Sequence, residues 1–276
     1  MKMEIASTQL RTLNAGDVEA AVELSSLAGW NQTAEDWQML VDLAPDGCFA
    51  VEAAGELVST TTIVCYGKRL AWIGMVLTRP EYRGLGFARQ LLAHALDYAD
   101  IRGVETVKLD ATEFGQPLYA KFGFLPEQTV ERWVRPGTAN SPSPGNCLDG
   151  SEFACELDSH AFGADRSTLL KRLARRSRVH ADSGTFLFAR AGRNFRYLGP
   201  SISTSIETIR PLFIRAIDES ADAAWAWDLL PKNRPPVALA LELGFSRQRL
   251  LTRMFRGKQL TRRDDMVYAI AGFELG

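Results

Sequence analysis

The segment Arg83-Gly84-Leu85-Gly86-Phe87-Ala88 combines residue types that can bind an anion. Gly84 and Gly86 leave the backbone uncrowded, so consecutive N–H groups can point outward where a helix begins. The first turn of a helix has unpaired N–H donors and a partial positive charge, which suit a phosphate. Arg83 and Arg89 add full positive charges. A turn that uses glycine only for its conformation explains the same glycine pair equally well.

Two well-known phosphate-binding loops do not match this segment. The dinucleotide-binding fingerprint needs a third glycine where this chain has Arg89, and the P-loop needs a Gly-Lys-Ser/Thr that is absent. The pattern that remains is Arg-Gly-x-Gly-x-Ala, preceded by Pro80-Glu81-Tyr82.

The segments around the glycine pair predict a strand, a tight loop and a helix. An apolar run extends from Leu70 to Leu77, and apolar residues at helical spacing extend from Phe87 to Ala99. Similar patterns predict a first strand in 1–13, two helices beginning at 18 and 34, strands at 48–53, 57–66, 104–109 and 129–134, and a short helix at 118–122.

This order of elements, with the glycine loop, resembles the GCN5-related N-acetyltransferase (GNAT) family over residues 3–135. The motif Leu-Tyr-x-x-x-Gly-Phe at Leu118 to Phe124 extends the likeness. The resemblance implies an α/β fold with a mixed sheet, the pyrophosphate of acetyl-CoA on the loop amides, and its pantetheine arm along a strand edge. The implied acetyl-CoA contacts are Val76, Leu77, Thr78, Arg83, Gly84, Leu85, Gly86, Phe87, Ala88 and Tyr119.

The resemblance also implies direct transfer of an acetyl group to an amine, without an acyl-enzyme. Tyr119 is then the proton donor to the leaving thiolate, since a phenol with a pKa of ~10 can return a proton to it. Asp110 either orients the acceptor or carries a proton through water, or it caps the end of a strand. Glu81 is a candidate base, or it shapes the turn. Trp30 and Asn31 are expected in the acceptor wall, with Trp30 as a core residue as the alternative.

Residues 147–276 repeat features of residues 1–135. The sequence Leu239 to Phe245 matches Leu118 to Phe124, and Ala226-Trp227-Asp228 matches Lys108-Leu109-Asp110. The sequence therefore predicts two tandem domains of the same fold, which we call the first copy (1–135) and the second copy (147–276). Residues 136–146, rich in proline, glycine and serine, are the expected linker.

The second copy lacks the chemistry of the first. Its stretch Tyr197 to Ile202 aligns with the glycine loop, and Pro200 has no N–H to offer a phosphate. Ala240 stands where the first copy has Tyr119. We therefore expect a degenerate domain that shapes the acceptor cleft. With Gly29-Trp30-Asn31, Arg253-Met254 and the final Ala-Gly-Phe, the chain resembles bacterial two-domain acetyltransferases of the YitH/HolE type.

Composition limits the partners. The hydrophobic content of 46% and the charged content of 24% are typical of a soluble globular protein. No apolar stretch approaches the ~20 residues of a membrane span, and the N-terminus lacks the core of a signal peptide. Four scattered cysteines have no metal-ligand spacing. We expect a cytoplasmic bacterial enzyme that binds no metal and no membrane.

A basic run, expected to be helical, includes Arg166, Lys171, Arg172, Arg175, Arg176 and Arg178. A solvated helix face is the preferred reading, and nucleic acid is not an expected partner, because aromatic residues do not interleave with these charges. The sequence hypothesis is an acetyl-CoA-dependent N-acetyltransferase that acts on a primary amine of a small molecule or protein. The alternative is an acyl-CoA-binding regulatory module with little turnover. The acceptor, the base and the choice between monomer and homodimer stay open.

Overall fold

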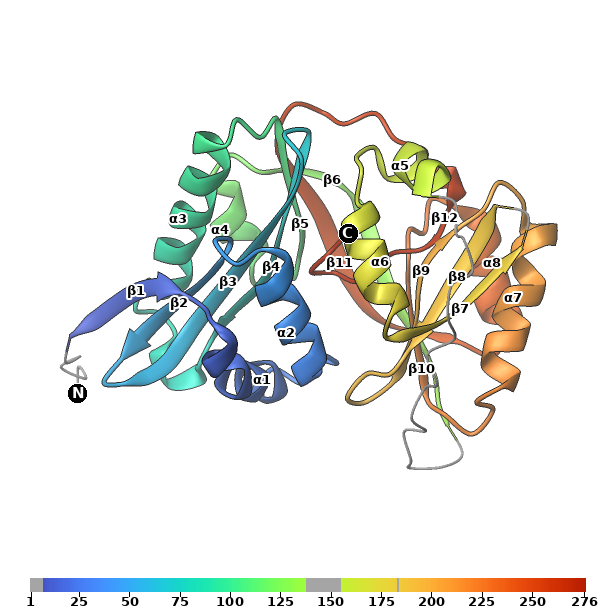
Figure 1. Cartoon of the computed structure of the whole chain (residues 1–276), viewed down its shortest axis with the longest axis horizontal. Helices are drawn as coiled ribbons and strands as arrows, with labels where there is room; N and C mark the ends of the chain where they lie inside the picture. The colour runs from blue at the N-terminus through green and yellow to red at the C-terminus, as the bar shows by residue number, and fades with distance from the viewer. Residues whose placement is uncertain (1–6, 138–154, 183) are drawn as a thin grey trace. The chain divides into compact units, whose positions relative to one another are not determined.

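The computed structural model describes residues 7–137, 155–182 and 184–276 (Figure 1). The chain forms two compact units, Met1–Leu109 and Asp110–Gly276, which are described separately below. Most of the expected linker, from residue 138 on, lies outside the described residues, as do residues 1–6 of the expected first strand. The limits of these units reflect which residues pack together. The predicted domain limits, 1–135 and 147–276, instead reflect the internal sequence repeat.

The first unit is a mixed sheet with helices on both faces (Figure 1). Strands β1 (Thr8–Thr12), β2 (Cys48–Ala53), β3 (Glu56–Tyr66) and β4 (Leu70–Thr78) are antiparallel neighbours, and β5 (Thr106–Ala111) is parallel to β4. Most residues of β3 and β4 are buried, which requires cover on both faces. Helices α1 (Val18–Leu27), α2 (Ala34–Leu43) and α3 (Phe87–Ile101) supply that cover.

Local signals in the sequence fix these helices. Thr33 and Asp36 form a capping box at the start of α2. The buried face of α3 is the apolar stripe read from the sequence, Phe87, Leu91, Leu92, Ala95, Leu96 and Ala99. The 3₁₀ turns η1 (Ala15–Asp17) and η2 (Pro80–Tyr82) precede α1 and the glycine loop.

The second unit contains a sheet in the order β11-β6-β10-β9-β8-β7. Its strands are β6 (Leu125–Arg135), β7 (Ser177–Asp182), β8 (Thr185–Arg190), β9 (Arg196–Ile202), β10 (Trp225–Leu229) and β11 (Ser246–Gly257). Strand β6 belongs to the first copy of the repeat, yet it pairs antiparallel with β10 on one edge and β11 on the other. Both neighbours of β6 come from the second copy.

The helices of the second unit are α4 (Gln116–Ala120), α5 (Cys155–Phe162), α6 (Ser167–Ala174), α7 (Ile206–Asp218) and α8 (Arg234–Glu242). Its core is built around Trp227, whose ring stacks on Phe213 at 4.1 Å between centroids and meets Phe245 edge-on. The 3₁₀ turn η3 (Asp264–Met266) leads into a short strand, β12 (Val267–Ala269), that pairs with β9.

Two expectations for the second copy are wrong in detail. The stretch Tyr197 to Ile202, expected to correspond to the glycine loop, instead lies within β9. The basic run is not one helix, because α6 ends at Ala174 and Arg178 lies on β7. Arg166 is buried beside Asp158, with bonds of 2.8 and 2.9 Å, so it belongs to the core rather than to a solvated face. Among the described residues, no helix is both long and apolar enough to cross a membrane.

Candidate functional site

The glycine loop of the first unit has the backbone conformation that its residue types predict. Gly84 and Gly86 have φ angles of +79° and +90°, in the left-handed region that favours glycine. A Cβ placed on either residue would meet no atom within 4 Å. The glycines are therefore required for the turn itself, and the space above them is open to a ligand.

The helix that follows this loop begins without a cap of its own. Gly86 is the N-cap residue, it offers no side chain, and the first turn of α3 contains no acidic residue. The first bond within the helix runs from the Gln90 N–H to the Gly86 carbonyl, at 3.0 Å. The N–H groups of Phe87, Ala88 and Arg89 thus lack a helical acceptor, which leaves the partial positive charge available to an anion.

The strand before the loop carries a β-bulge. Thr62 of β3 pairs with Gly74 and Thr60 pairs with Leu77, so β4 has one extra residue between these pairs. Met75, in this bulge, has a φ of +50°. The Thr60 hydroxyl donates to the Met75 carbonyl at 2.8 Å. Similarly, the Ser59 hydroxyl donates to the Leu77 carbonyl at 2.6 Å. These two β3 hydroxyls, which the sequence analysis missed within the run Ser-Thr-Thr-Thr, hold the bulge.

The bulged part of β4 has an open edge. Strand β5 pairs with β4 at Ala71 and Trp72, near the start of the strand. Within the described residues of the first unit, no strand pairs with the other edge of β4 from Gly74 to Thr78. The predicted contacts Val76, Leu77 and Thr78 therefore lie on a free strand edge, directly before the glycine loop.

The other predicted residues of the first unit lie on two separate turns. Trp30 and Asn31 are in the α1–α2 connection, with Trp30 half-buried and Asn31 buried. The Trp30 N–H donates to the Ser25 carbonyl at 2.9 Å, which fixes this turn. Glu81 is exposed in η2. A shared role for Glu81, Trp30 and Asn31 is a prediction from the sequence.

Tyr119 lies in the second unit, on α4, and is 8% exposed. Its ring packs edge-on against Phe124 at 6.1 Å between centroids, which ties the short helix to the Gly-Phe turn that follows it. Burial raises the pKa of the Tyr119 phenol above its ordinary value. The phenol therefore stays protonated at neutral pH, as a proton donor must.

Asp110, at the end of β5, forms a buried ion pair with Arg253 of β11. Two parallel bonds of 2.8 Å join the guanidinium to the carboxylate. The side chain of Asp110 is 0% exposed and that of Arg253 is 2% exposed. Both carboxylate oxygens are thus engaged by Arg253. The sequence analysis did not foresee this pair, although both copies carry an aspartate at a strand end and an arginine in the last strand.

The second copy differs from the first at its corresponding helix start. Since β9 runs parallel to β10 as β4 does to β5, β9 is the counterpart of β4. The counterpart of the glycine loop is therefore 203–205, and the alignment with Tyr197 to Ile202 was wrong. Here the Ser205 hydroxyl accepts from the Glu207 N–H at 3.1 Å, and Glu207 adds a carboxylate to the first turn of α7. This helix start has its own cap and its own anion.

The chain itself also fills the space beside β9. Strand β12 pairs with Ser201 and Ile202 on β9, and the Ile270 N–H donates to the Asp228 carbonyl of β10 at 3.1 Å. A Cβ on Gly199 would lie 2.2 Å from the Ile270 carbonyl oxygen. The glycine thus permits close passage of the chain's own backbone, at the place where the first unit has an open strand edge.

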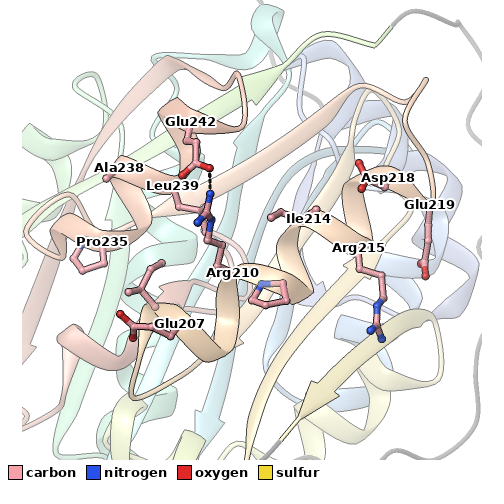
Figure 2. Close-up of a pocket in the computed structure, with 12 residues that line it drawn as sticks. Glu207, Arg210, Ile214, Arg215, Asp218, Glu219, Pro235, Ala238, Leu239 and Glu242 are labelled. Carbon is pink, nitrogen blue, oxygen red and sulfur yellow. Dashed lines mark hydrogen bonds and ion pairs between the residues drawn. The ribbon is translucent and has the colours of Figure 1, made fainter.

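The second unit also has a surface groove of about 1200 Å³ between α7 and α8 (Figure 2). Its floor is apolar, with Ile214 and Leu239, and an ion pair between Arg210 and Glu242 connects the two helices. None of the predicted site residues lines it. The groove is therefore separate from the chemistry predicted from the sequence.

Two family models match the chain one after the other. The acetyltransferase (GNAT) family model matches residues 19–124, and an acetyltransferase (GNAT) domain model matches residues 154–269. Together they span more than half of the chain. Among curated relatives, the chain is 30% identical over 173 residues to the uncharacterized N-acetyltransferase YitH of Bacillus subtilis, a match that covers 60% of each protein. It is 24% identical over 264 residues to holothin acyltransferase of a Pseudoalteromonas species, covering 90% of this chain and 87% of that one.

Solved structures show the same fold. A putative acetyltransferase of Pyrococcus horikoshii matches with a TM-score of 0.85 and 21% identity, covering 100% of this chain and 98% of that one. A tandem GNAT protein from the clavulanic acid biosynthesis pathway matches with a TM-score of 0.63 and 14% identity, covering 92% and 100%. With its glycine loop, bulged strand and repeated fold, the chain belongs to the acetyltransferase (GNAT) family and carries two GNAT domains in tandem.

Proposed function

We propose that the protein is an acetyl-CoA-dependent N-acetyltransferase that moves an acetyl group directly to a primary amine of a small molecule or protein. The observation that carries this proposal is the first unit's combination of an uncapped helix start, two left-handed glycines and a free strand edge. A pyrophosphate fits N–H groups that lack an acceptor, and a pantetheine amide fits an unpaired strand edge. Residues of this chain therefore fit the cosubstrate that the family implies.

In the proposed reaction the amine nitrogen attacks the thioester carbonyl, the new C–N bond forms and the C–S bond breaks. Tyr119 returns a proton to the thiolate, a role supported by its burial and raised pKa. Glu81 is the proposed base, and Trp30 and Asn31 are proposed to contact the acceptor. Asp110 is proposed to act through its ion pair with Arg253 rather than on the acceptor.

The second copy is proposed to bind no acetyl-CoA and to help shape the acceptor cleft. Two observations support this: the capped start of α7, and the segment after Met266 that fills the edge of β9. The proposed domain limits remain 1–135 and 147–276. We further propose a cytoplasmic location, and acetyl-CoA and an amine as the partners.

Acetyl-CoA should raise the melting temperature of the wild-type protein, and Gly86→Val should abolish that shift. A β-branched residue at a φ of +90° is strained and would crowd the loop amides. Gly55→Val is the matched control, because Gly55 has a φ of +82° and equally open surroundings in the β2–β3 turn. Both variants should lose similar basal stability, but only Gly55→Val should keep the acetyl-CoA shift. A shift that survives unchanged in Gly86→Val contradicts the assigned loop.

An acceptor screen separates the enzyme from the alternative, an acyl-CoA-binding module. Free CoA release would be followed with polyamines, amino acids, aminoglycosides and lysine peptides. Turnover with any primary amine supports the transferase. Acetyl-CoA binding without CoA release across all four classes favours the regulatory module.

A further inference from the structure

The second unit contains two ion pairs related by the internal repeat. Asp110 lies one residue before the end of β5, and Asp228 lies one residue before the end of β10. Asp110 pairs with Arg253 of β11, which belongs to the second copy. Asp228 pairs with Arg132 of β6, which belongs to the first copy, with bonds of 2.8 and 2.6 Å. Each copy therefore supplies the arginine for the aspartate of the other.

Both pairs have the geometry of rigid contacts. Each arginine binds both oxygens of its aspartate, and both carboxylates are fully buried. Removal of one partner from a buried pair leaves an uncompensated charge, so such contacts hold their geometry strongly. A bidentate fork also fixes orientation, which a lysine ammonium does not reproduce.

The surroundings of the two pairs differ at the helix that follows each aspartate. The helix that begins six residues after Asp110 is α4, which carries Tyr119, whereas Ala240 occupies the corresponding place on α8. The neighbour of Arg253 on β11, Thr252, accepts a bond of 2.9 Å from the side chain of Gln116, the first residue of α4. Two adjacent residues of β11 thus bind the two ends of the connection between β5 and α4: Arg253 binds Asp110, and Thr252 binds Gln116. This connection leads to Tyr119.

We propose that Arg253, on the second copy, is a positioning residue for the Tyr119 segment of the first copy. This inference depends on the proposed function, because it gives the proton donor its place. A displacement of about 1 Å of a reacting group can lower a rate by about 10²-fold, so loosening this segment should lower kcat. The second copy then contributes to turnover without binding the cosubstrate.

The repeat provides a matched control for the test. Arg253→Lys and Arg132→Lys each replace a buried bidentate arginine that pairs with a strand-end aspartate. Both variants should lower Tm, with the smaller loss in Arg132→Lys because the Tyr197 hydroxyl also donates to Asp228 at 3.0 Å. Arg253→Lys should lower kcat about tenfold or more while the KM for acetyl-CoA changes little, and Arg132→Lys should keep kcat within about twofold. Equal loss of kcat in both variants, or none in Arg253→Lys, overturns the proposal.

Two further variants keep the test decisive. In a Tyr119→Phe background, Arg253→Lys should lower kcat little further, because the effect of Arg253 depends on the Tyr119 phenol. If the two substitutions lower kcat independently, so that their effects add, Arg253 does not act through Tyr119. If Arg253→Lys does not fold, Thr252→Val removes only the hydroxyl that meets Gln116, and it should lower kcat without raising the KM for acetyl-CoA. A wild-type protein that releases no CoA with any amine instead contradicts the proposed function, a result distinct from equal effects of the two lysine variants.

Discussion

At the scale of single residues, the surroundings of two proposed site residues fix their protonation or direction. Tyr119 is buried and its ring packs edge-on against Phe124, and burial raises the pKa of its phenol. Asp110 is held at both oxygens by Arg253. The sequence identified both residues, but the buried partner of Asp110 is 143 positions away and follows from folding alone.

Tyr119→Phe should lower kcat by about 10²-fold and leave acetyl-CoA affinity nearly unchanged, because a positioned general acid contributes about this much. Steady-state kcat and a binding measurement on the same variant check this. A variant with wild-type kcat removes Tyr119 from the mechanism.

The pH profile gives an independent check. A group whose folded-state pKa is raised stays protonated past its ordinary value, which is about 10 for tyrosine. The proposed proton donor is therefore protonated from neutral pH to about pH 10 and is lost only above it. We expect no decline of kcat caused by Tyr119 below about pH 10. A midpoint near pH 8 that disappears in Tyr119→Phe would contradict the assignment.

At the scale of elements, β4 of the first unit carries a bulge and pairs with β5 only at Ala71 and Trp72. The elements up to β5 follow directly from apolar periodicity, capping residues and turn glycines. The bulge at Met75 does not, because Met75 is an ordinary strand residue by type and its φ of +50° is imposed by pairing with β3. The prediction that Tyr197 to Ile202 corresponds to the glycine loop was wrong for a related reason. These residues belong to β9 because they pair with β8 and β12.

Thr60→Val should weaken acetyl-CoA binding by about tenfold. The change keeps the shape of the side chain but removes the hydroxyl that donates to the Met75 carbonyl, and an unpaired buried acceptor costs about 1–3 kcal/mol. Calorimetric titration measures the affinity. Thr61→Val is the control, because the Thr61 hydroxyl is equally buried but bonds to the Thr60 carbonyl and not to β4. Equal affinity loss in both variants would exclude a specific role for the bulge.

At the scale of the whole molecule, the chain contains two copies of one fold that have specialised differently. The repeat and its missing tyrosine were visible in the sequence. Two features were not: the strand β12 beside β9, and the place of β6 between two strands of the other copy. Both features depend on pairing between strands that are distant in the sequence. A single sequence does not show which of these strands pair or in which register.

The protein should bind one acetyl-CoA per chain. The second copy's helix start carries Ser205 and Glu207, and its strand edge is filled by residues 267–270. Native mass spectrometry with excess acetyl-CoA would count the bound molecules. Two per chain, with the second retained in Gly86→Val, would show that the second copy has kept a site.

Strand β6 also constrains how the gene can change. Because β6 is encoded with the first copy but pairs with β10 and β11 of the second, neither copy can be exchanged by recombination as an intact module. A substitution on β11 must remain compatible with a strand encoded more than a hundred codons earlier. The strands of the second copy complete the sheet to which β6 belongs, so this copy is needed for the fold even if, as proposed, it binds no acetyl-CoA.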